Sequence, residues 1–244
     1  MKRSFLFILF LAAMLGLFTS AGALTVQIGP DGATPTTSYF PIYGLYGYNY
    51  SQQIYFPSEI GYAAPITKIR FWYVSGTITN SKDWVIYMGH TTQSDFSTTT
   101  SWIPLTSLTQ VFAGDVSSIM TGSAGWKEIT LTTAFNYNNT DNLVIAVDEN
   151  TSGYSSMSWG GYTPGTTYRG IEYYNDSTNP NPSSPPTANY RGTTIDRIQL
   201  EMTVVGYPGV PTNPSPANNA TNVAQSGTLT WDFGADTTTY SRLS

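Results

Sequence analysis

Apolar and polar residues alternate with a period of two along much of this chain. The segment 66–74 shows the pattern best. Its two alternating sets are Ile69, Phe71 and Tyr73 on one side and Lys68, Arg70 and Trp72 on the other. Side chains of a β-strand point to opposite faces in turn, so this segment is predicted to be a half-buried strand with a polar face.

The same pattern extends over the rest of the chain. It predicts further strands at residues 84–89, 109–113, 126–131, 142–148, 154–159, 170–174 and 195–205. Gly, Pro, Asn and Ser clusters separate these segments, and no segment has a sustained helical period. We therefore expect an all-β fold, a jelly-roll-like antiparallel β-sandwich over residues 24–206. The proline-rich segment 175–189 is expected to be a long exposed loop.

The N-terminus has the three parts of an export signal. Lys2 and Arg3 precede an apolar run at residues 4–18, and Ala21-Gly22-Ala23 offers a small-x-small cleavage site. The apolar run is shorter than the roughly 20 residues of a membrane span. We expect residues 1–23 to be a signal peptide, with no membrane insertion after its removal. The protein is expected to be secreted or on the cell surface of a bacterium.

Composition excludes several classes of function. Without Lys2 and Arg3, 8 basic residues face 15 acidic ones, which leaves a net charge of −7. A chain of this charge is a poor ligand for nucleic acid or an anionic membrane. The chain contains no cysteine, which excludes thiol catalysis and cysteine-ligated metals. The absence of disulfides indicates a core large enough to be stable without them.

A change of composition marks a domain boundary. Residues 207–211 read as a stiff Pro/Gly linker. After it, a Pro-rich entry, an Asn/Ala/Thr turn at residues 217–222 and the pair Leu229 and Trp231 resemble the opening of bacterial immunoglobulin-like and fibronectin type III-like repeats. Such domains need about 100 residues. Residues 212–244 are therefore expected to form an incomplete domain of this kind, and the intact product is expected to continue.

The large domain also has a family resemblance. Residues 50–55, 66–71, 85–91 and 141–150 resemble N-terminal modules of large secreted bacterial proteins. Those modules precede fibronectin-like repeats and often a C-terminal sorting domain of type IX secretion. The resemblance implies a secreted or surface-attached multidomain protein, and it transfers no catalytic residue to this chain.

Aromatic residues supply the candidate ligand contacts. Tyr46, Tyr48 and Tyr50 would share one face of a strand, where they could stack on sugar rings. The alternative is a cross-strand aromatic ladder that stabilises the sheet. Trp72 shares the predicted outer face of its strand with Lys68 and Arg70, and is the best single candidate for a ligand contact.

Metal and catalytic signals are sparse. Asp148 and Glu149 could give oxygen ligands to a structural calcium ion, although a solvated turn at the strand end is the alternative. His90 is the only histidine, and neither a hydrolytic triad nor a nucleophile elbow accompanies it. We therefore predict no catalytic residue and no cofactor.

These features favour a non-catalytic binding or adhesion module. Its expected partner is an extracellular polysaccharide or a surface protein, with carbohydrate favoured by the neutral, aromatic-rich and Thr/Asn-rich composition. The competing hypotheses are an accessory domain of a secreted peptidase or glycosidase whose catalytic part lies beyond residue 244, and a structural spacer.

Overall fold

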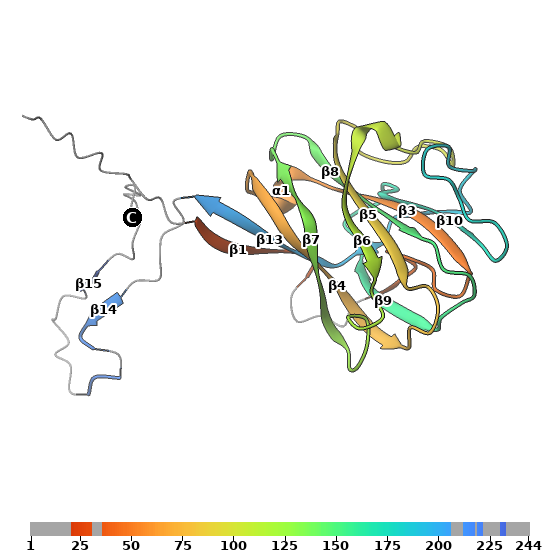
Figure 1. Cartoon of the computed structure of the whole chain (residues 1–244). Coiled ribbons are helices and arrows are strands. Elements are labelled where there is room, and N and C mark those ends of the chain that lie inside the picture. Colours follow the sequence, from red (N-terminus) through yellow and green to blue (C-terminus); the bar gives the residue numbers. More distant parts are fainter. Residues whose placement is uncertain (1–20, 31–35, 206–211, 218, 222–229, 233–244) are drawn as a thin grey trace, which may run out of the picture. The chain divides into compact units, whose positions relative to one another are not determined.

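The alternating segments form two antiparallel sheets that pack face to face (Figure 1). The computed structural model describes residues 21–30, 36–205, 212–217, 219–221 and 230–232. The prediction of an all-β antiparallel sandwich is confirmed.

Each sheet draws on strands that are far apart in the sequence. Five strands of the seven-stranded sheet follow one another in the order β1 (Ala21–Ile28), β13 (Ile198–Val205), β4 (Ala64–Gly76), β9 (Met157–Tyr162) and β12 (Ile195–Asp196). The other two strands pair with members of this series: β2 (Thr36–Ser38) with β9, and β7 (Gly125–Tyr137) with β4. The six-stranded sheet has the order β11 (Tyr190–Gly192), β10 (Gly170–Asn175), β3 (Tyr48–Tyr55), β8 (Asn142–Glu149), β5 (Asp83–Thr91) and β6 (Leu108–Asp115). Two short helices, α1 (Pro57–Ile60) and η1 (Leu105–Ser107), lie in the connections.

The core between the sheets follows the predicted alternation. Ile69, Phe71 and Tyr73 of β4 are fully buried. Phe71 meets Trp84 of the opposite sheet edge-on, with ring centroids 6.2 Å apart. Trp159 of β9 packs against both of these rings, so large aromatic side chains join the two sheets at this point.

Two features differ from the sequence prediction. The expected strand at residues 195–205 is divided into β12 and β13, because the Arg197 amide donates to the carbonyl of Gly160 and the chain there changes its neighbour from β9 to β4. Strand β3 has no apolar alternation because seven of its eight residues are buried, on both faces of the sheet. A strand covered on both sides does not show a period of two.

Two loops cover part of the outer face of the six-stranded sheet. Residues 92–104 and 176–189 meet there, and Trp102 Nε1 donates to the carbonyl oxygen of Pro186 at 2.8 Å. Most residues of the expected loop 175–189 are exposed or half-buried, whereas Pro180 and Ala188 are buried. The apolar contact with the sheet explains why this proline-rich segment is ordered against it.

The chain divides into two compact units. Residues 23–204 form the unit that carries the sandwich. In the other unit, β14 (Thr212–Ser215) and β15 (Thr230–Asp232) form an antiparallel pair. The predicted signal peptide up to residue 20, the linker 207–211 and most of the predicted immunoglobulin-like segment lie outside the described residues. No helix within the described ranges has the length and apolar character needed to cross a bilayer.

Candidate functional site

Five tyrosines from separate parts of the chain meet beside β10 and β11, at one edge of the six-stranded sheet. Tyr174 lies on β10 opposite Asn49, and Tyr190 lies on β11 opposite Glu172. Paired residues of neighbouring strands project to the same face, so both rings lie on the face that the other sheet covers. The loop before β3 adds the remaining three rings. We call this cluster the tyrosine surface: Tyr39, Tyr43, Tyr46, Tyr174 and Tyr190.

The five rings form a continuous series of contacts. The centroid distances are 5.4 Å for Tyr190–Tyr39, 4.5 Å for Tyr39–Tyr43, 5.3 Å for Tyr43–Tyr46, 4.3 Å for Tyr46–Tyr174 and 5.2 Å for Tyr43–Tyr174. Two of these pairs are edge-to-face, with interplanar angles of 86°. Such geometry is favourable for aromatic pairs, so the rings hold one another in place.

Hydrogen bonds to backbone groups fix the loop that carries three of the rings. Asn49 Oδ1 accepts from the amide of Tyr43 at 2.9 Å, and Ser51 Oγ donates to the carbonyl of Pro41 at 2.6 Å. At the far end, the Ser155 amide donates to the carbonyl of Gly44 at 2.6 Å. A side chain at Gly44 would meet that Ser155 carbonyl at 2.7 Å. Glycine is therefore required where the loop lies against the segment before β9.

A cavity of about 200 Å³ opens beside the tyrosine surface. Its lining residues are Tyr39, Ile42, Tyr43, Leu45, Ser156, Met157 and Ser158. Tyr39 and Leu45 are 45% and 50% exposed, so aromatic and aliphatic groups face solvent next to serine hydroxyls. The volume lies below the roughly 300 Å³ at which pockets for drug-sized ligands begin, and it suits a single ring or side chain.

Glu172 lies behind the rings, and its electrostatic interaction with Tyr43, Tyr174 and Tyr190 is one of the causes that raise the pKa of these phenols. Its side chain is fully buried, and neither carboxyl oxygen has a hydrogen-bond partner among the described residues. Burial raises the pKa of Glu172 well above its ordinary value. The backbone amide of Tyr43 acts in the opposite direction and lowers this pKa, but by less. Burial also raises the pKa of Tyr43, Tyr174 and Tyr190. The three phenols therefore stay protonated at neutral pH, and each can both donate and accept a hydrogen bond.

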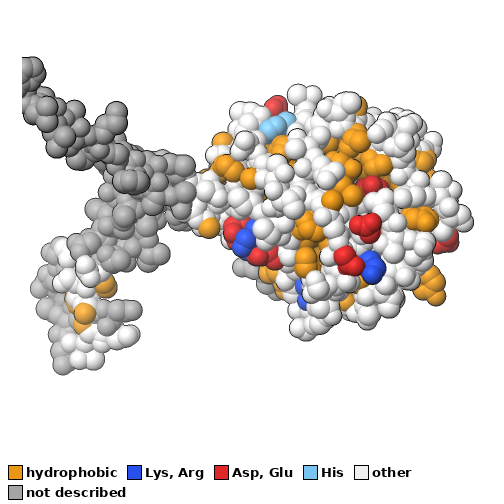
Figure 2. Space-filling model, viewed as in Figure 1, with side chains coloured by type: hydrophobic (Ala, Val, Ile, Leu, Met, Phe, Trp, Pro, Cys, Tyr) orange, Lys and Arg blue, Asp and Glu red, His pale blue; other side chains and the backbone are white. Residues whose placement is uncertain are grey.

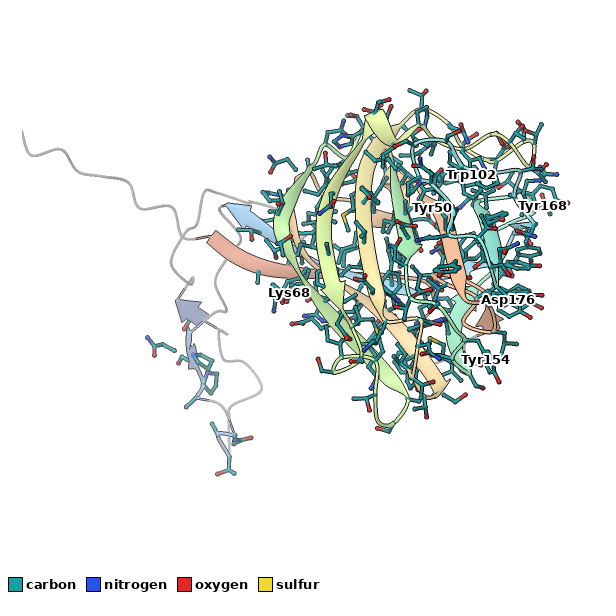
Figure 3. The ribbon with its side chains drawn as sticks, turned by 45° about the vertical axis from the view of Figure 1, so that its right-hand side comes forward. Tyr50, Lys68, Trp102, Tyr154, Tyr168 and Asp176 are labelled. Carbon is teal, nitrogen blue, oxygen red and sulfur yellow. The ribbon has the colours of Figure 1, made fainter. Side chains whose placement is uncertain are left out.

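The structure separates the three tyrosines that the sequence analysis grouped together. Tyr46 lies before β3 and joins the tyrosine surface, whereas Tyr48 and Tyr50 lie on the outer face of β3. Tyr50 is fully buried beneath Trp102, with ring centroids 5.2 Å apart (Figure 3). Its hydroxyl accepts a hydrogen bond from Gln52 Nε2 at 3.0 Å. Tyr46 is thus the member of this group that belongs to the candidate site.

Trp72 lies on the outer face of β4, as the alternation predicts. Its ring is edge-on to Trp126 of β7 at 5.1 Å, and the Arg197 guanidinium lies 4.7 Å from its centroid. The guanidinium also lies 5.0 Å from the Trp126 ring. A cation therefore already covers one face of the Trp72 ring.

Asp148 and Glu149 are neighbours in β8 whose side chains point to opposite faces. Asp148 is opposite Tyr50 on the outer face, and Glu149 is opposite Asn49 on the inner one. The structure does not bring the two carboxylates together. The described residues contain no group of three or more His, Cys, Asp or Glu side chains arranged to hold a metal ion.

His90 and the glutamate Glu59 of α1 both have structural partners. His90 Nε2 accepts from the amide of Asn138 at 3.1 Å, and its ring stacks on Tyr137 at 5.7 Å. Glu59 forms an ion pair with the buried Arg169 at 2.8 Å. These contacts close a turn and join α1 to the strand region before β10.

Sequence reasoning singled out Tyr46 but not the other four members of the tyrosine surface, which are Tyr39, Tyr43, Tyr174 and Tyr190. The only local signal was the spacing of Glu172 and Tyr174, which places both on one face of a strand. More than 100 residues separate Tyr43 from Tyr174, and only the pairing of β10 with β3 brings them together. No protein-family model, no curated protein and no solved structure matches this chain.

Proposed function

We propose that this chain is a non-catalytic extracellular module that binds a neutral polysaccharide at the tyrosine surface. The observation that carries the proposal is the series of five touching tyrosine rings beside an open cavity. Sugar rings present C–H faces that pack on aromatic planes, and hydroxyls that pair with neutral phenols. The exposed Tyr39 ring, together with Ser156 and Ser158, offers both kinds of contact at one place.

The surroundings of the tyrosine surface favour an uncharged ligand. Glu172 lies behind the rings, where burial raises its pKa well above its ordinary value and so favours the neutral carboxyl group. Asp176 Oδ1 accepts from the amide of Gly47 at 3.2 Å, which orients this carboxylate toward the backbone of the loop. With the N-terminal export signal, this chemistry suits a secreted or surface-attached bacterial protein that adheres to an extracellular polymer.

The test compares two tyrosines of equal exposure. Tyr39 is 45% exposed within the site, and Tyr62 is 46% exposed outside it. Binding of the purified chain to soluble hexasaccharides of cellulose, xylan, β-1,3-glucan, mannan and chitin is measured by isothermal titration calorimetry. We expect Tyr39→Ala to weaken binding about 10-fold, since one stacked ring contributes on the order of 1 kcal/mol or more. Tyr62→Ala should leave affinity unchanged.

Circular dichroism of each variant establishes that it is folded. A folded wild-type chain that binds none of the five saccharides would overturn the proposal. So would an equal loss of affinity in the two tyrosine variants, because binding would then not depend on this surface.

A further inference from the structure

The cavity beside the tyrosine surface has a mainly apolar lining. Two of its seven lining residues are tyrosines, and three have apolar side chains without a ring. We call these three residues the aliphatic wall: Ile42, Leu45 and Met157. Ile42 is buried and Met157 is half-buried against the core, whereas Leu45 is 50% exposed. The aliphatic wall therefore extends from the bottom of the cavity to its rim.

The polar groups of the cavity are few and uncharged. The other two lining residues are Ser156 and Ser158, and neither hydroxyl forms a hydrogen bond with another described residue. Both hydroxyls can therefore donate to or accept from a ligand. The wider surface is also poor in charge, since Figure 2 shows far more uncharged than charged side chains on the visible face of the sandwich. An ionic ligand would find no opposite charge among the lining residues.

The segment that carries these serines is held in place by the loop after β4. Ser155 is buried, and its Oγ donates to the carbonyl of Asn80 at 2.7 Å and accepts from the amide of Asn80 at 2.8 Å. The Ser156 carbonyl accepts from the amide of Thr77 at 2.8 Å. A Cβ at Gly76 would clash with that carbonyl oxygen, so glycine permits this close approach. The cavity is thus preformed, and little binding free energy is lost in ordering it.

The aliphatic wall disfavours a fully hydroxylated sugar in this cavity. Glucose and galactose carry a hydroxyl on each exocyclic position, and two serines can pair with only a few of them. A hydroxyl placed against the aliphatic wall would lose hydrogen bonds to water without replacement. A methyl group in the same position would instead bury apolar area.

We propose that the cavity binds the methyl group of a neutral sugar whose ring packs on the tyrosine surface. This inference rests on the proposed function, and it narrows the ligand to polysaccharides whose residues carry a methyl group. Such a group has two common sources, the C6 methyl of a 6-deoxyhexose and the N-acetyl methyl of an amino sugar. The cavity volume of about 200 Å³ suits one sugar residue of either kind.

The test uses three pairs of free sugars that differ only at the methyl position. L-fucose with L-galactose and L-rhamnose with L-mannose each compare a methyl group with a hydroxymethyl group. N-acetyl-D-glucosamine with N-formyl-D-glucosamine compares a methyl group with a hydrogen atom. Binding to the purified chain is measured by saturation-transfer NMR, which gives the dissociation constant and shows which ligand protons contact the protein.

Two leucine variants locate the contact. Leu45→Ser removes the exposed member of the aliphatic wall, where the loss of core packing is small. Leu105→Ser is the control, because Leu105 of η1 is half-buried and does not line the cavity. Circular dichroism of each variant establishes that it is folded.

We expect the methyl-bearing sugar of at least one pair to bind about 10-fold more tightly than the other sugar, as is typical of one group in an apolar pocket. The pair that shows this preference identifies the source of the methyl group, and its methyl protons should receive the strongest saturation. Leu45→Ser should reduce the preference to about 3-fold, because part of the apolar contact is lost. Leu105→Ser should leave the preference unchanged.

Three results would overturn this inference and leave the proposed function in place. They are equal binding within every pair, an unchanged preference in Leu45→Ser, and tighter binding of the tripeptide Gly-Leu-Gly than of any sugar, which would assign the cavity to a side chain of a polypeptide. In each case the hexasaccharide titrations still report on the tyrosine surface. A chain that binds neither these sugars nor the hexasaccharides would overturn both proposals.

Discussion

The outer faces of the two sheets have opposite electrostatic arrangements. On the seven-stranded sheet, Lys68 and Arg70 of β4 lie between Glu128 of β7 and Glu201 of β13, and all four form ion pairs. On the six-stranded sheet, neither Asp83 nor Asp148 forms an ion pair with a lysine or arginine of the described residues. The strand register decides which side chains lie side by side on each face, and it places cations beside the carboxylates only on the seven-stranded sheet.

This contrast extends to protonation. Burial opposes ionisation of Glu128, yet hydrogen bonds from Lys68 and Arg70 lower its pKa. In β8 burial raises the pKa of Asp148 to about 6 and that of Glu149 to about 8. A carboxylate surrounded by cations stabilises the fold when it is ionised, whereas a buried one without a cation stabilises the fold when it is neutral.

The largest expected effect concerns Glu149. Its pKa is higher in the folded chain than in the unfolded one, so its contribution to stability is complete below about pH 4 and is lost as pH rises toward 8. We expect the contribution of Glu149 to the unfolding free energy to fall by on the order of 3 kcal/mol from pH 5 to pH 8. Glu149→Gln keeps an acceptor for the Thr151 amide and should remove most of this fall, as measured by urea denaturation at each pH.

An identical pH slope for wild type and Glu149→Gln would show that Glu149 is ionised in the folded chain. The two sheets would then differ less in their electrostatics than the structure indicates.

The next effect tests whether the Trp72 ring on the outer face of the seven-stranded sheet contributes to stability and not to ligand binding. Trp72→Ala removes the edge-on contact with Trp126 and the ring under Arg197. Trp72 is half-buried, so we expect a loss of about 2 kcal/mol, less than for a fully buried tryptophan. Polysaccharide binding should not change. A normal unfolding midpoint together with lost saccharide binding would instead assign this face a ligand.

The smallest effect concerns the exposed ion pairs. Glu128 is 38% exposed at its side chain, so solvent weakens its attraction to Lys68 and Arg70. Glu128→Gln should cost about 0.5 kcal/mol at pH 7. The cost should vanish as pH falls through the lowered pKa of Glu128, which is the opposite of the Glu149 dependence. Thermal denaturation at pH 7 and pH 3 measures both values, and a cost that grows in acid would contradict the arrangement.

Sequence reasoning was most successful where one strand was enough. The alternation in residues 66–74 placed Ile69 inside and Trp72 outside, and the structure agrees. It did less well for β3, whose two buried faces show no alternation. The tyrosine surface was only partly predictable, because Tyr46 came from a dense aromatic segment whereas Tyr174 and Tyr190 reach it through strand pairing.

The sequence by itself determined the all-β class and, for the strands that alternate, their inward and outward faces, because alternation is a local property of a chain with a two-residue repeat. Only the tertiary structure decided which faces meet. The order of the strands places the Tyr174 ring against the Tyr43 ring and the Asp83 carboxylate near that of Asp148. It also places Glu128 where it forms an ion pair with Arg70. Such pairings depend on register and packing across distant segments, and no local pattern in one strand specifies its neighbour.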